Sequence, residues 1–131
     1  MTQEDRELLF KDLCARLPYE VKVKIGNNIY IVDGIDIGLN DEGEWVPCIC
    51  THGMTTVEIE YCKPYLFPMS SMTEEQIKEA LTTKHKINLS SGKFMYLDSS
   101  KTVEFYNKKH IDYQGLIPMG LANDATGLNI Y

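Results

Sequence analysis

The chain has 131 residues, of which 44% are hydrophobic and 24% are charged, with a net charge of −6. These proportions are close to those of average globular proteins and exclude a disordered chain, a collagen-like repeat and a coiled coil. A chain of this length buries roughly two thirds of its surface on folding, so we expect one domain over residues 1–131. No apolar run reaches the roughly 18 residues of a membrane helix, and the first residues do not resemble a secretory signal. We therefore expect a cytoplasmic protein without membrane contact.

The first half of the chain is predicted to form a helix and then strands. Thr2 can cap a helix over residues 3–16, in which leucines recur every three to four residues, and Pro18 ends it. After this point apolar residues alternate with polar ones between Gly and Asn turns, a pattern typical of an antiparallel meander or a small SH3-like barrel. The four predicted strands span residues 21–25, 29–37, 45–51 and 55–61.

The second half of the chain carries helical signals. Pro64 and Pro68 lack backbone donors, so residues 63–68 are not expected to form a central strand. Thr73 and Gln76 have the spacing of a capping box. The predicted elements are a helix over residues 74–84, a loop over 88–101 with an extended piece at 94–97, a helix over 101–109 and helical apolar spacing over 110–122. The predicted fold class is α+β, with an N-terminal helix, a four-stranded antiparallel sheet and a helical C-terminal third.

Negative charge is concentrated in the middle of the chain, where residues 18–62 contain eight acids against Lys22 and Lys24. The whole chain has two arginines, so direct binding of nucleic acid is not expected. An acidic sheet face can instead attract a basic protein partner, and aromatic residues are enriched at protein interfaces. The candidate partner-binding residues are Asp33, Asp36, Glu58, Glu60, Tyr61, Tyr65 and Phe67.

The strongest candidate for a metal or reactive site is a cluster of three cysteines and one histidine, which matches the ligand preference of a tetrahedral zinc site. Its residues are Cys48, Cys50, His52 and Cys62. Residues two apart on a straight strand are, however, about 6.5 Å apart, too far to share a metal without a bend. The preferred interpretation is that these are small side chains packed on a strand. A small zinc- or thiol-dependent enzyme built on these four residues is the alternative.

No recognisable catalytic motif is present: the sequence has no P-loop, no dinucleotide-binding fingerprint and no EF-hand loop. We therefore expect a non-catalytic interaction protein without a cofactor, and the sequence leaves a homodimer open. A second alternative is an acidic protein that mimics nucleic acid and competes for a nucleic-acid-binding partner.

Three further motifs span residues 12–19 (DLCARLPY), 63–75 (KPYLxPMSSMTEE) and 110–122 (HxDYxGLIxxGLA), where x marks a position that is not part of the motif. Together they resemble a family of small uncharacterised proteins that are common in prophages and mobile elements of gut bacteria. That family has no established activity, so the resemblance implies an accessory protein of such an element rather than a reaction. The matching residues are mostly apolar residues, glycines, prolines and cap formers, as expected of a fold signature.

Overall fold

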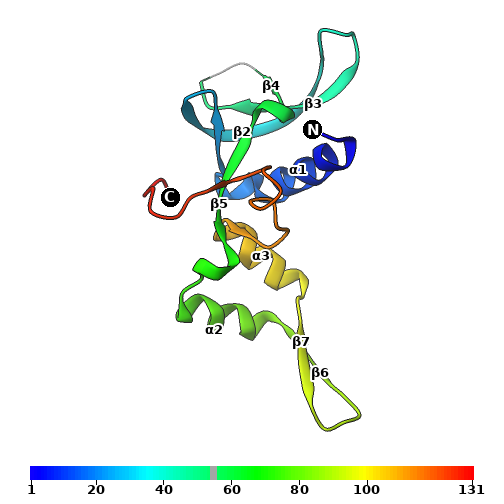
Figure 1. Cartoon of the computed structure of the whole chain (residues 1–131), viewed down its shortest axis with the longest axis vertical. Coiled ribbons are helices and arrows are strands. Elements are labelled where there is room, and N and C mark those ends of the chain that lie inside the picture. The colour runs from blue at the N-terminus through cyan, green and yellow to red at the C-terminus, as the bar shows by residue number, and fades with distance from the viewer. Residues whose placement is uncertain (54–55) are drawn as a thin grey trace.

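A seven-stranded sheet and helix α1 (Gln3–Arg16) make up one half of an elongated molecule, and two further helices and a hairpin make up the other (Figure 1). The computed structural model describes residues 1–53 and 56–131. The strand order is β4-β3-β2-β1-β5-β8, and β9 also pairs with β5. The expected α+β class, with an N-terminal helix and a mostly antiparallel sheet, is confirmed.

Helix α1 has the predicted bounds, and two reciprocal hydrogen bonds cap its first turn. The Thr2 hydroxyl accepts a hydrogen bond from the backbone N–H of Asp5, and the Asp5 carboxylate accepts one from Thr2. Leu9 and Leu13 are fully buried against the sheet. Burying a side chain of this size contributes roughly 1.5–3 kcal/mol. A 3₁₀ turn, η1 (Leu17–Tyr19), follows, with Pro18 at its start.

The first four strands are antiparallel to their neighbours, as predicted. The turn between the first two contains Gly26 at φ +62°, a left-handed conformation that glycine adopts without strain. The fourth strand is shorter than expected because the chain turns into a 3₁₀ turn, η2 (Ile59–Tyr61); Thr55, its expected first residue, lies outside the described residues. The strands are β1 (Lys22–Ile25), β2 (Asn28–Leu39), β3 (Trp45–Thr51) and β4 (Val57–Glu58).

The expectation that residues 63–68 do not form a central strand is wrong. They form β5 (Lys63–Pro68), which pairs antiparallel with β1 and parallel with β8 (Ile111–Asp112) and β9 (Asn123–Asp124). The prolines are tolerated because the residues between them make the ladder bonds. The N–H of Phe67 donates to the carbonyl of His110 at 2.8 Å, and the carbonyl of Leu66 accepts a hydrogen bond of the same length from the N–H of Ala125.

Two helices frame a hairpin in the other half of the molecule. Helix α2 (Glu74–Thr83) begins at the predicted Thr73–Gln76 capping box, and α3 (Ser100–Lys108) lies one residue from its predicted bounds. The extended piece over 94–97 is β7 (Phe94–Leu97). Its partner β6 (His85–Asn88) was not predicted, because its side chains are exposed and carry no apolar alternation. A 3₁₀ turn, η3 (Met69–Ser71), connects β5 to α2.

Residues 110–122 do not form a helix, so the expectation of a helical C-terminal third is wrong. They contain β8 followed by turns in which Gly115 and Gly120 have φ +76°. The sheet has seven strands rather than four, because β5, β8 and β9 join the predicted ones; β8 and β9 contribute two residues each and pair with β5, which is far away in the sequence. Strands this short leave no periodic pattern for sequence analysis to detect. In the described part of the chain, none of the helices has the length and apolar character that crossing a bilayer requires.

The apolar residues pack in two clusters. The larger one lies between α1 and the sheet and includes Leu13, Val23, Ile49 and Leu66. The smaller one lies around α2 and α3, where Phe105 and Tyr106 pack on Ala80 and Ile111.

Candidate functional site

An acidic cleft of about 320 Å³ opens beside the sheet, between the start of α1, the β2–β3 turn and the β4–η2 segment. Val46, Pro47 and Ile59 contribute apolar surface to it. Among the residues that the structure describes, Arg6 supplies the positive charge of its lining. Its charged lining is otherwise made of five carboxylates from two separate segments of the chain: Asp41, Glu42, Glu44, Glu58 and Glu60.

The β2–β3 turn holds three of these carboxylates at the rim of the cleft. The side-chain oxygen of Asn40 accepts hydrogen bonds from the backbone N–H groups of Glu42 (3.0 Å) and Glu44 (2.9 Å). Asn40 also pairs with Glu44 through the backbone, and Gly43 occupies the left-handed region at φ +78°. Glu42 and Glu44 take part in this turn only through their backbone atoms, so their carboxylates remain available to bind a ligand.

Glu58 and Glu60 have opposite pKa shifts although they are two residues apart. A hydrogen bond from Arg6 Nη2 to Glu60 Oε2 (3.0 Å) lowers the pKa of Glu60. Partial desolvation, followed by the adjacent Glu60 carboxylate, raises the pKa of Glu58. Among the described residues, the polar side chains of the cleft lining are carboxylates, the Arg6 guanidinium, the Asn40 amide and the Tyr61 hydroxyl. Its chemistry is that of a site that attracts cations.

The predicted partner-binding residues are divided among several places. Glu58, Glu60 and Tyr61 line the cleft. Asp36 lies in the same cross-strand row as Glu58, with Cys48 of β3 between them.

The other three predicted residues lie away from the cleft. Asp33 stands at the irregularity in β2 and accepts a hydrogen bond from the His52 ring at 3.2 Å. Tyr65 is buried in β5, and Phe67 packs against the ring of Tyr131 with centroids 5.8 Å apart. The structure thus brings together Asp36, Glu58, Glu60 and Tyr61 but not the complete set.

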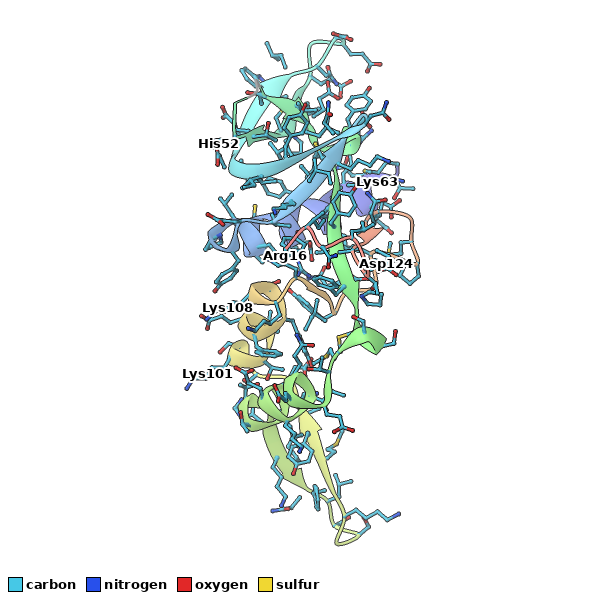
Figure 2. The ribbon with its side chains drawn as sticks, turned by 90° about the vertical axis from the view of Figure 1, so that its left-hand side faces the viewer. Arg16, His52, Lys63, Lys101, Lys108 and Asp124 are labelled. Atoms are coloured by element: carbon cyan, nitrogen blue, oxygen red, sulfur yellow. The ribbon has the colours of Figure 1, made fainter. Side chains whose placement is uncertain are left out.

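The cysteines and histidine of the zinc alternative each have a different neighbour. The Cys48 thiol donates to Val46 O, the Cys62 thiol donates to Glu58 O, and the Cys50 thiol lies 3.9 Å from the Thr56 hydroxyl. His52 is exposed at the edge of the sheet (Figure 2). Among residues 1–53 and 56–131, no group of three or more His, Cys, Asp or Glu side chains is placed to hold a metal ion.

The two buried thiols are held in the protonated state. Desolvation raises the pKa of Cys48, and it raises the pKa of Cys62 to about 12. Because the thiolate is the nucleophile and the metal ligand, these two cysteines are chemically inert near neutral pH.

A buried ion pair that sequence analysis missed lies at the centre of the molecule (Figure 2). Arg16 and Asp12 are both fully buried and joined by two hydrogen bonds of 2.9 and 3.1 Å. Arg16 also donates to the carbonyls of Ile111 (2.7 Å) and Tyr106 (3.5 Å). Desolvation raises the pKa of Asp12, and Arg16 offsets part of that shift. The sequence signal for this pair was the spacing of Asp12 and Arg16, which lie four residues apart on one helix. Their burial depends on α3 and β8, which are far away in the sequence.

Asp112 and His110 complete this centre. The carboxylate of Asp112 accepts hydrogen bonds from the backbone N–H groups of Leu116 (2.8 Å) and Ile117 (2.9 Å). The His110 ring stacks on Tyr131 with centroids 3.8 Å apart. Residues of the first and third motifs of the family resemblance therefore meet around Arg16, and the second motif joins the third through the pairing of β5 with β8.

Tyr131 links this centre to two strands. Its hydroxyl donates to Tyr65 O (2.8 Å) and accepts from the backbone N–H of Lys22 (2.9 Å). The Lys22 ammonium also donates to the carbonyl of Ile130.

Folding stability is expected to depend on His110 below pH 6.5. Burial, followed by the charges of Arg16 and Lys22, lowers the pKa of His110 from 6.5 to about 4. The neutral ring is thus favoured in the folded state, so its contribution is complete above pH 6.5 and is lost as the pH falls from 6.5 toward 4. We expect the free energy of unfolding of the wild type to fall more steeply over this interval than that of His110→Asn, as measured by urea denaturation. Parallel pH profiles for the two proteins would contradict the assignment.

The fold and the cleft define an α+β protein with an acidic, cation-attracting cleft and a buried ion pair at its centre. No family model, curated protein or solved structure matches this chain.

Proposed function

We propose that the protein is a non-catalytic interaction protein of a phage or mobile element, and that its acidic cleft binds a basic segment of a protein partner. The observation that carries the proposal is the gathering of five carboxylates and one arginine around a single cleft. The phage or mobile-element origin rests on the three sequence motifs described above.

The cleft favours a segment that combines Lys or Arg with apolar side chains. Its carboxylates supply acceptors for ammonium or guanidinium groups, and charged hydrogen bonds of this kind are stronger than neutral ones. Tyr61 adds an aromatic ring on which a cation can stack. Val46 and Ile59 add apolar contact, which a purely polycationic ligand would not use.

The test is capture of a partner from lysate of bacteria carrying the element, followed by affinity measurement with the purified partner. We expect Glu58→Gln with Glu60→Gln to weaken binding by about tenfold, because two of the five carboxylates in the cleft lining lose their charge. The melting temperature should change little, since the Arg6–Glu60 pair is partly exposed to solvent and surface pairs contribute about 0–1 kcal/mol.

The matched control is Glu75→Gln with Glu79→Gln, which removes the same charge from the exposed face of α2. This control should bind like the wild type. Equal loss in both double variants would show that net charge rather than the cleft is responsible. Unchanged affinity in the cleft variant would overturn the proposal.

A further inference from the structure

The β6–β7 hairpin lies at one end of the long axis, and every residue of both strands is exposed (Figure 1). Ile87 pairs with Met95, next to the pair His85 and Leu97, so these four side chains share one face of the hairpin. The relative exposure of Phe94 is 52%, and that of Met95 and Leu97 is 43%. A two-stranded sheet with both faces open is marginally stable alone. Cover from another molecule would therefore stabilise it.

The hairpin is basic as well as apolar. Residues 85–97 contain Lys86, Lys93 and His85 and no carboxylate. The ammonium of Lys86 lies 4.2 Å from the centre of the Phe94 ring, so the charge is carried on the aromatic face of the hairpin. A second copy of the same hairpin would place lysines against lysines. The charge thus disfavours pairing of two hairpins with each other.

The opposite end of the molecule has the complementary character. The β2–β3 arm carries a ladder of exposed apolar side chains, because Leu39 pairs with Trp45 and Ile37 pairs with Pro47 on one face. Ile37, Leu39 and Trp45 are 62%, 60% and 71% exposed. The acidic turn with Asp41, Glu42 and Glu44 joins these two strands and borders the acidic cleft.

We propose that the β6–β7 hairpin of one copy docks on the β2–β3 arm and the adjoining acidic cleft of a second copy. The aromatic face of the hairpin, on which Phe94 and Tyr96 lie with Lys86, then meets the apolar side chains of the arm, and the hairpin lysines meet the carboxylates of the turn. The inference rests on the proposed function, since it names a second copy of this chain as one basic partner of the cleft. The two surfaces differ and lie at opposite ends of the molecule, so the contact is head-to-tail and builds open chains or rings of copies (Figure 1).

Sedimentation velocity over a range of protein concentrations tests this contact. We expect the wild type to associate beyond a dimer as its concentration rises, and added salt to weaken the association because the charges lie at the surface. Lys86→Glu with Lys93→Glu, and separately Glu42→Lys with Glu44→Lys, should each weaken self-association by about tenfold or more. Mixing these two variants should restore it, because each reversed surface then meets an opposite charge.

The matched control for the hairpin variant is Lys101→Glu with Lys108→Glu, which reverses two exposed charges on α3 (Figure 2). This control should associate like the wild type. A wild type that stays monomeric at all concentrations would overturn the inference. An association that neither double variant weakens, or that the mixture fails to restore, would overturn it as well.

The two proposals fail in different ways. If the protein is monomeric at all concentrations, but substitution of Glu58 and Glu60 weakens its binding to a foreign partner, self-association alone is overturned. If mixing the two charge-reversed variants restores self-association, but substitution of Glu58 and Glu60 leaves the affinity for a foreign partner unchanged, the foreign-partner proposal is overturned and the head-to-tail contact is retained.

Discussion

Replacing Asp12 by alanine is expected to lower the free energy of unfolding by about 3–5 kcal/mol, the cost of removing one partner of a buried ion pair. The substitution leaves the guanidinium of Arg16 fully buried, with backbone carbonyls as its remaining partners. Urea denaturation at neutral pH measures the loss. Glu7→Ala, on the exposed face of the same helix, is the control and should change stability by no more than about 0.5 kcal/mol.

A second variant distinguishes an unpaired charge from a general packing defect. Asp12→Leu with Arg16→Met removes both charges and should recover part of the stability that Asp12→Ala loses. Recovery should be incomplete, because the Ile111 carbonyl then loses its 2.7 Å donor. A loss below about 1 kcal/mol for Asp12→Ala would show that the pair does not hold the centre of the fold.

Replacing Asp112 by alanine is expected to cost about 2–4 kcal/mol, because the N–H groups of Leu116 and Ile117 lose their acceptor and an unsatisfied buried group costs about 1–3 kcal/mol. Asp112→Asn keeps one acceptor oxygen and should cost less. Thermal and urea unfolding of both variants measure the difference.

The control for this prediction is Asp124→Ala. Asp124 also accepts a hydrogen bond from a backbone N–H, that of Thr126 at 2.8 Å, but it is an exposed residue at the end of β9 (Figure 2). Water can replace its carboxylate, so we expect a loss of less than about 1 kcal/mol. Equal losses for Asp112→Ala and Asp124→Ala would show that burial of the first site does not matter.

Sequence analysis predicted the elements that are specified by neighbouring residues. The Thr2 and Thr73 caps fix the start of α1 and α2, and Gly26 fixes the first hairpin turn, because each acts through residues a few positions away. The parallel pairing of β5 with β8 and β9 was missed, because it joins segments more than 40 residues apart. Pro64 and Pro68 also argued against a strand at β5, because proline lacks a backbone donor.

The candidate site was predicted in part for the same reason. Glu58 and Glu60 were selected as acids of a predicted sheet face and Tyr61 as an aromatic residue, and all three line the cleft. Asp41, Glu42, Glu44 and Arg6 also line the cleft but were not among the predicted site residues. No local pattern indicates that the start of α1 lies beside the η2 segment, where Arg6 reaches Glu60.

The position of β5 also constrains the order in which the protein can fold during synthesis. β5 lies between β1, which is made earlier, and β8 and β9, which leave the ribosome more than 40 residues later. Arg16 likewise waits for the carbonyls of Tyr106 and Ile111, more than 85 residues downstream. The β1–β4 meander and the α2–α3 segment can form from local contacts, while closure around β5 must be among the last events. Contacts between residues so distant in sequence slow folding, so the nascent chain keeps one edge of its sheet open until translation of this sequence is nearly finished.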